Sequence, residues 1–168
     1  MKLQNKTLVL FFAFLISTFA FAQKKVASPA ETVTGKINGA TITIKYGSPS
    51  VKGRAIWGAL VPYDKVWRAG ANDATTFETD KTITIEGKQL PAGKYSFFVI
   101  PNEKESIVIF NKEAKQWGSY DYKASSDQLR VTVKNENGDA LVEKLEYKIM
   151  ETRIELLWEK LIIGFEVK

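Results

Sequence analysis

Two-residue alternation of apolar and polar side chains limits what this chain can fold into more than any other feature. Ile42, Ile44 and Tyr46 alternate with polar residues, and the same pattern recurs over 82–86 and 129–134. Successive side chains of a β-strand point to opposite faces of its sheet, so each such segment is typical of a strand with one buried face. The chain is therefore expected to be built largely from half-buried strands.

Two other segments are apolar on both faces. They are 95–100 and 107–110, "YSFFVI" and "IVIF", and a polar turn at 102–105 separates them. A strand without a polar face is typically covered on both sides. We therefore expect these two strands to lie in the middle of a sheet and to be joined as a hairpin.

Asn-Gly pairs at 38–39 and 137–138 indicate hairpin turns, because a type I′ turn needs positive φ at both central residues. Alternation in three successive segments of 145–167 predicts three C-terminal strands, although the Glu, Lys and Leu content there would also suit a helix. Short strands at this spacing predict an all-β fold: an antiparallel β-sandwich or jelly-roll-like domain of about eight to ten strands, with no helix longer than about three turns.

The first 22 residues have the organisation of a secretory signal. Two lysines precede an apolar run over 8–19, and Ala20-Phe21-Ala22 is a small-x-small cleavage site. The alternative is a membrane anchor, but the run is shorter than the roughly 20 residues that span a bilayer. We expect cleavage after Ala22, export to the periplasm or the extracellular space, a flexible leader over 23–32, and a single β-sandwich domain over 33–168.

The absence of His and Cys restricts the chemistry of the chain. Without His there is no Ser-His or Cys-His nucleophile, and the commonest general base and metal ligand are missing. Without Cys there is no thiolate chemistry and no disulfide. Carboxylate, Lys, Tyr or Ser chemistry remains, or no catalysis at all. No recognisable catalytic motif is present, so the residues favour a protein that is not an enzyme.

Charge and motifs also argue against several partners. Of the net charge of +5, two units belong to the signal lysines, which leaves +3 on residues 23–168. The basic residues are scattered among acidic ones, so we expect no nucleic-acid partner. No D-x-[DN]-x-[DN]-G calcium loop occurs, and we expect neither a metal nor a cofactor.

A continuous segment, "SPSVKGRAIWGALVPYDKVWRAGANDATTF", resembles the domain of unknown function 2911 family of exported bacterial proteins. The family pattern of Lys-Gly-Arg, Leu-Val-Pro-Tyr and Val-Trp-Arg-x-Gly-Ala-Asn is present over 52–54, 60–63 and 66–72, and "LPAGKYSFFVIP", "WGSYDY" and "LLWE" extend the resemblance over most of the chain. Asp73 departs from it, because the family usually has Glu there. The resemblance implies a β-rich exported domain and no particular activity.

The same segment is the best candidate for a ligand site. Two arginines present planar forks for anions, three aromatic residues offer flat faces, and an amide, a carboxylate and a hydroxyl precede a strand that is expected to begin near Thr75. The candidate ligand-binding residues are Arg54, Trp57, Tyr63, Trp67, Arg68, Asn72, Asp73 and Thr75. A predicted loop of about 30 residues without regular structure is usually functional, or else part of it has been wrongly assigned as a loop.

Each feature also has a purely structural interpretation. Taken singly, Trp57 and Trp67 are slightly better suited to cap one end of the core than to stack on a ligand. Arg54 or Arg68 would lock the loop by pairing with Asp64 or Asp73, and Asn72 suits a left-handed turn. A second aromatic stretch, "WGSYDY" at 117–122, is more typical of a core plug than of a site.

Three functions remain open at this stage. The residues favour a binding module for a small polar ligand, either glycan-like or anionic. The first alternative is a carboxylate-dependent hydrolase such as a glycosidase, in which Asp73 would act with Glu159, Asp121 or Glu78. The second alternative is a structural protein of the envelope that contacts another protein through the long loop.

Overall fold

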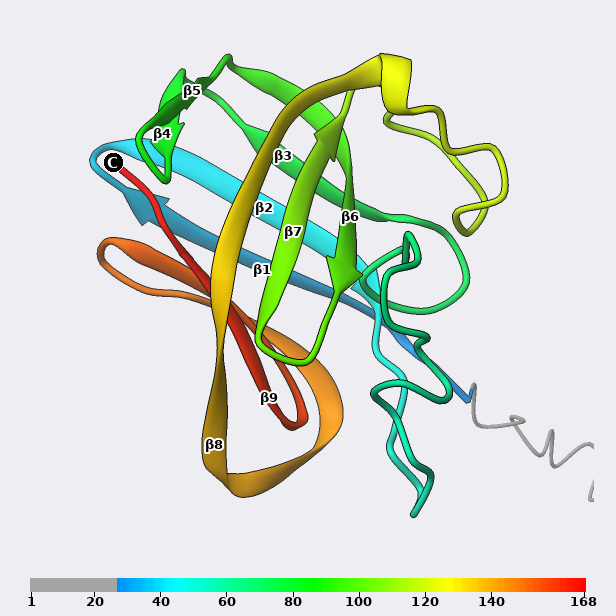
Figure 1. The fold of residues 1–168 in the computed structure, drawn as a ribbon. Coiled ribbons are helices and arrows are strands. Elements are labelled where there is room, and N and C mark those ends of the chain that lie inside the picture. The colour runs from blue at the N-terminus through cyan, green and yellow to red at the C-terminus, as the bar shows by residue number, and fades with distance from the viewer. Residues whose placement is uncertain (1–26) are drawn as a thin grey trace, which may run out of the picture.

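The computed structural model describes residues 27–168 (Figure 1). The predicted signal over 1–22 lies outside these residues. Within residues 27–168, no helix has both the length and the apolar character that a membrane crossing requires. The first strand begins at Ala30, so the last residues of the expected leader already pair with the second strand.

The regular secondary structure of the described residues is almost entirely antiparallel β-structure, which confirms the predicted class. Seven strands form a curled sheet in the order β1-β2-β3-β6-β7-β8-β9, and β4 and β5 form a second, two-stranded sheet. The only helical element of residues 27–168 is the short 3-10 helix η1 (Ala124–Ser126). The strands are β1 (Ala30–Ile37), β2 (Ala40–Gly47), β3 (Thr75–Thr79), β4 (Ile83–Ile85), β5 (Lys88–Leu90), β6 (Gly93–Pro101), β7 (Glu105–Asn111), β8 (Asp127–Ile149) and β9 (Arg153–Glu166).

The large sheet is a meander, since its neighbouring strands follow one another along the chain apart from the excursion through β4 and β5. The two fully apolar segments are β6 and β7, and they pair with each other near the middle of the sheet as expected. Figure 1 shows the sheet curled so that β1 and β2 pass behind β7 and β8. This curl gives the molecule its sandwich-like form.

The two Asn-Gly pairs have different outcomes. Asn38 and Gly39 have φ of 48° and 77° and connect β1 to β2, which confirms the first hairpin. The hairpin predicted at Asn137-Gly138 is wrong, because both residues lie inside β8 and Asn137 pairs with Leu161 of β9. A long partner strand is present on both sides of this dipeptide, so the chain bulges there and does not reverse.

The C-terminal part contains two strands where three were predicted. The second and third predicted strands are one continuous strand, β9. The least exposed side chains before Glu159 are even-numbered (Ile154, Leu156 and Trp158, at most 1% exposed), with Leu157 also buried at 6%. From Leu161 to Val167 the buried side chains are odd-numbered, and Glu159 itself has a φ of 58°. A single left-handed residue thus reverses which face is buried without ending the strand.

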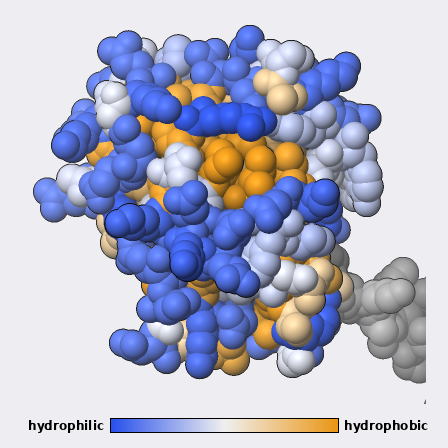
Figure 2. Space-filling view, in the orientation of Figure 1, coloured by the Kyte–Doolittle hydropathy of each residue, from blue (hydrophilic) through white to orange (hydrophobic). Residues whose placement is uncertain are grey.

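Aromatic side chains fill the interior of the curled sheet. Phe77, Phe97, Phe110 and Phe165 contact one another with ring centroids 5.0–6.3 Å apart. A smaller apolar cluster lies on the outer face around Phe98. Figure 2 shows apolar side chains uncovered over β6 and β7 on this face, with hydrophilic groups around them.

Candidate functional site

The segment between β2 and β3, residues 48–74, contains no strand or helix longer than an isolated bridge. It is nevertheless held firmly against the sheet. Trp67 exchanges two backbone hydrogen bonds with Val99 of β6 (N···O 2.8 and 2.9 Å), and the Val51 amide donates to the Glu143 carbonyl of β8 (2.8 Å). The predicted long irregular segment is therefore an ordered part of the fold.

Three tryptophans meet beneath this segment. Trp67 stacks on Trp158 of β9 with centroids 6.0 Å apart, and Trp57 contacts both rings edge-on. The Trp57 indole N–H donates to the Trp158 carbonyl (3.3 Å). Trp67 is only 9% exposed. Trp57 and Trp67 thus mainly pack against each other and against Trp158, as a cap on one end of the core.

A cleft of about 270 Å³, here called the arginine cleft, opens beside these rings. Four of the eight candidate residues line it, together with Trp158 and several small or apolar residues. No Asp or Glu is among its lining residues. The four candidates are Arg54, Trp67, Arg68 and Asn72.

The two arginines of the cleft are held differently. Arg54 is exposed and donates to the carbonyls of Val51 (3.1 Å) and Ser50 within its own turn. The Nε of Arg68 is buried and has no hydrogen-bond partner. Within residues 27–168 neither guanidinium forms an ion pair, so the proposed lock with Asp64 or Asp73 is not formed.

Trp158 adds a second buried donor without a partner. Its side chain is 1% exposed, it lines the arginine cleft, and its indole N–H makes no hydrogen bond. Trp158 is not among the residues that the sequence predicts for the site, because nothing in its spacing places β9 beside the long segment. An aromatic residue followed by a break in alternation at Glu159 was the only available signal.

The backbone at Ala69 shapes the turn that carries Arg68. Ala69 is fully buried with a φ of 52°, and its carbonyl accepts hydrogen bonds from Thr75 Oγ1 (3.0 Å) and from the Tyr147 hydroxyl (2.7 Å). Burial raises the pKa of Tyr147 well above its usual value of 10.0, so this hydroxyl stays a donor. Thr75 therefore supports the turn from beneath and is not a lining residue of the cleft.

Asn72 lies where two concavities meet. Its φ of 65° fits the left-handed turn that its residue type indicated, and its side-chain amide donates to the Ser28 carbonyl (3.2 Å). It lines the arginine cleft and also a shallower hollow of about 340 Å³, the outer hollow, where Asp73 lies with Lys45 and Lys94. The structure thus separates Asp73 from the two arginines.

The remaining candidate residues do not reach the arginine cleft. Tyr63 lines neither concavity, and its ring lies against Gly58, where a Cβ would be 2.9 Å from the ring. The carboxylates considered for hydrolysis, Asp73, Glu78, Asp121 and Glu159, are all absent from the cleft lining. Residues 27–168 also contain no group of three or more acidic side chains that would hold a metal ion.

The second aromatic stretch behaves differently from a core plug. Only Tyr122 packs inward, with its ring 5.1 Å from that of Phe98. Trp117 is 60% exposed and Tyr120 is 81% exposed. Both belong to residues 112–126, the aromatic loop, which connects β7 to β8.

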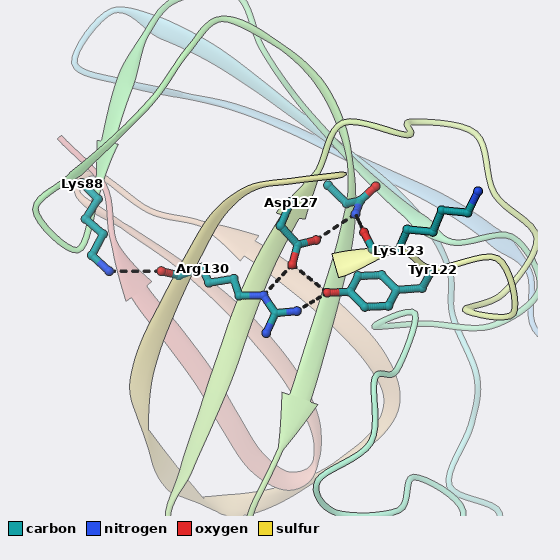
Figure 3. A network of polar contacts seen from close by, with 6 residues as sticks. Lys88, Tyr122, Lys123, Asp127 and Arg130 are labelled. Atoms are coloured by element: carbon teal, nitrogen blue, oxygen red, sulfur yellow. Dashed lines mark hydrogen bonds and ion pairs between the residues drawn. The ribbon is translucent and has the colours of Figure 1, made fainter. Parts of the chain in front are cut away.

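Polar contacts fix the C-terminal end of the aromatic loop to β8 (Figure 3). The Tyr122 hydroxyl donates to Asp127 Oδ2 (2.7 Å), and Arg130 donates both to the same carboxylate oxygen and to the Tyr122 hydroxyl. Buried Asn111 donates to Asp127 Oδ1 (2.8 Å) and to the Lys123 carbonyl (3.0 Å). Burial, with Asp127 as acceptor, raises the pKa of Tyr122 to about 12.

Comparison with known proteins gives one match. The model of a family described as protein of unknown function (DUF2911) matches residues 28–167, which is nearly the whole described part of the chain. No curated protein and no solved structure matches the chain. The resemblance to this family is thereby confirmed. The family description gives no activity, so only the residues of the site indicate its chemistry.

Proposed function

We propose that this chain, which belongs to the domain of unknown function 2911 family, is a binding module for a small anionic ligand held in the arginine cleft. One observation carries the proposal. The buried Nε of Arg68 has no partner, in a cleft whose lining contains two arginines and no carboxylate.

An unpartnered buried donor is costly. Leaving such a group without a hydrogen bond costs about 1–3 kcal/mol, and more when the group is charged. Arg68 and Trp158 both bear this cost in the same cleft. A ligand that brings acceptor oxygens would satisfy both groups, and the planar guanidinium fork favours carboxylate or phosphate oxygens in particular.

The size and shape of the cleft support a small ligand. Its volume of about 270 Å³ lies just below the usual range for drug-sized pockets. Pro49, Leu60 and Val61 add apolar groups to its lining. The predicted signal over 1–22 would place this encounter outside the cytoplasm.

Binding is favoured over hydrolysis because the cleft has no acid–base pair. A glycosidase needs two carboxyl groups on opposite sides of the scissile bond, about 5–10 Å apart. None of the lining residues is a carboxylate. The donors of the cleft are suited to hold an anion and have no partner that would move a proton.

The test is calorimetric titration of residues 23–168 with phosphate, sulfate, succinate and galacturonate. At least one of these anions is expected to bind, and Arg68→Gln is expected to weaken that binding at least tenfold while the domain stays folded. Lys36→Gln, in which an exposed cation of β1 is lost, is the matched control. Equal affinities for Arg68→Gln and the parent, or no binding of any of the four, would contradict the proposal.

A further inference from the structure

Some of the exposed apolar side chains of residues 27–168 lie at the arginine cleft or on the loop next to it. Five large hydrophobic residues are exposed in residues 27–168, and three of them border the cleft or the loop next to it. These are Leu60, Trp117 and Tyr120. Exposed apolar groups that gather at one place usually mark a binding surface.

The aromatic loop is held in place at both ends. Asn111 accepts hydrogen bonds through its Oδ1 from the Glu113 amide (3.0 Å) and from the Gln116 side chain (3.2 Å), and the Gln116 carbonyl accepts from the Ala74 amide (3.0 Å). The other end is fixed by the contacts of Tyr122 (Figure 3). The rings of Trp117 and Tyr120 are therefore exposed on an anchored loop.

Two observations place the aromatic loop next to the arginine cleft. Gly118 has a φ of 65°, and a Cβ there would lie 2.9 Å from the Tyr120 ring and 3.7 Å from Nη1 of Arg68. Trp117 forms a backbone bridge with Asp73, the residue after Asn72. The aromatic loop thus adjoins the arginine cleft through both Arg68 and the chain that continues from Asn72.

We infer that the aromatic loop is a second subsite that binds a sugar ring, and that the ligand is an acidic oligosaccharide. The inference rests on the proposed function, since a carboxylate of the sugar occupies the arginine cleft. The cleft has room for about one sugar unit, so the next unit of a chain extends over the rim. There its apolar C–H face lies on Trp117 or Tyr120, which present flat apolar surfaces with polar tips.

The surroundings of the two rings favour a sugar over a protein partner. A specific protein interface usually buries more than about 1,000 Å². Here two rings stand among exposed polar residues, including Asp73, Lys115 and Asp121. These groups are suited to hydrogen-bond the hydroxyls around a sugar ring.

The experiment compares galacturonic acid with its linear trimer by calorimetric titration of residues 23–168. The trimer is expected to bind at least tenfold more tightly than the monomer. Trp117→Ala together with Tyr120→Ala is expected to remove this gain and to leave the monomer affinity unchanged, whereas Arg68→Gln weakens both. Leu141→Ala removes an exposed apolar side chain from β8 and is the control. Trp117→Phe keeps a ring and is expected to retain most of the gain.

The possible outcomes separate this inference from the proposed function. If monomer and trimer bind equally through Arg68, and the double substitution changes neither, the sugar subsite is refuted while the anion site stands. The same holds if phosphate or succinate binds through Arg68 and neither uronate does. If no anion binds, both proposals fail. Self-association that disappears in the double variant would assign the rings to a protein interface and overturn the inference.

Discussion

Tyr147 of β8 donates its hydroxyl to the carbonyl oxygen of Ala69, 2.7 Å away, and so ties the long strand to the turn that carries Arg68. Thr75 donates to the same oxygen from β3. Two buried hydroxyls from different strands therefore hold one left-handed residue. This contact connects the sheet to the arginine cleft without touching the cleft itself.

Loss of this hydroxyl is expected to affect stability and binding together. Tyr147→Phe should lower the free energy of unfolding by about 1–2 kcal/mol, because the Ala69 carbonyl keeps only the Thr75 hydrogen bond. Anion affinity should fall several-fold, because the Arg68 turn becomes less rigid. Urea unfolding and calorimetric titration of the same variant measure the two effects. Full affinity with reduced stability would show that the turn does not position Arg68.

Glu159 is expected to be a strained position. Its φ of 58° costs an L-residue roughly 1–2 kcal/mol, whereas glycine adopts this conformation freely. Glu159→Gly should therefore raise the free energy of unfolding by about 1 kcal/mol, and Glu159→Ala, which keeps the Cβ, should not. Chemical denaturation of both variants is the measurement. Equal stabilities of the two variants would mean that the left-handed backbone at Glu159 carries no strain.

Stability is expected to fall at alkaline pH because of Tyr122. Its pKa is about 12 in the folded protein, where burial and Asp127 favour the protonated hydroxyl, against 10.0 for the ordinary side chain. As pH rises from 10 to 12, Tyr122 loses its proton in the unfolded chain before it does so in the folded chain. The stabilisation that the protonated Tyr122 gives the folded state is therefore complete below pH 10 and is lost through this window. Tyr122→Phe should show a shallower decline in thermal stability from pH 9 to 11.5. Part of the decline should remain, because burial also raises the pKa of Tyr46, Tyr95 and Tyr147. Parallel profiles for variant and parent would contradict this assignment.

Arg68 and Asp73 are expected to contribute independently to stability. Arg68 lines the arginine cleft while Asp73 lines the outer hollow, and the two form no ion pair. In a double-mutant cycle of Arg68→Ala and Asp73→Ala, the coupling energy should stay below about 0.5 kcal/mol. Thermal and urea unfolding of the four proteins provide the cycle. A coupling energy above 1 kcal/mol would indicate that Arg68 and Asp73 stabilise the loop by pairing with each other, and would weaken the case for a ligand.

A side chain at Gly164 is expected to be costly. A Cβ there would lie 2.6 Å from Nε and Cζ of Arg153, whose guanidinium pairs with Glu136, Glu155 and Glu166 and would have to leave these partners to make room. Gly164→Ala should lower the free energy of unfolding by about 1–3 kcal/mol. The double variant with Arg153→Ala should recover part of this loss. A fully stable single variant would show that the arginine moves aside freely.

Sequence patterns predicted the secondary structure correctly where the conformation depends on residues that are neighbours in the sequence. Asn38-Gly39 closes a hairpin because both residues adopt the positive φ that the turn requires. The same dipeptide at 137–138 does not, because β9 is long enough to pair on both sides of it. Around Glu159 the buried side chains change from even-numbered to odd-numbered positions, and the sequence shows this change as two separate alternating segments. Such a change predicts the end of one strand and the start of another. A left-handed residue inside a single strand has no sequence signature when it is not glycine or asparagine.

The candidate site was predictable to the extent that it lies on one continuous segment. Arg54, Arg68 and Asn72 belong to residues 48–74 and meet in the same cleft. Asp73 is adjacent in sequence but lines only the outer hollow, while the left-handed Asn72 before it lines both concavities. Trp158 and the aromatic loop approach the cleft only through the pairing of distant strands, and no local pattern carries that information.

Trp158 belongs to β9, the last strand of a sheet whose order follows the chain, while both arginines of the cleft come from residues that precede β3. The cleft therefore lacks a wall until the final strand has been added. A polypeptide interrupted before β9 would carry every cationic group of the site and still offer no enclosed place for an anion. Such a truncated chain is therefore expected to lose the anion affinity proposed for the arginine cleft.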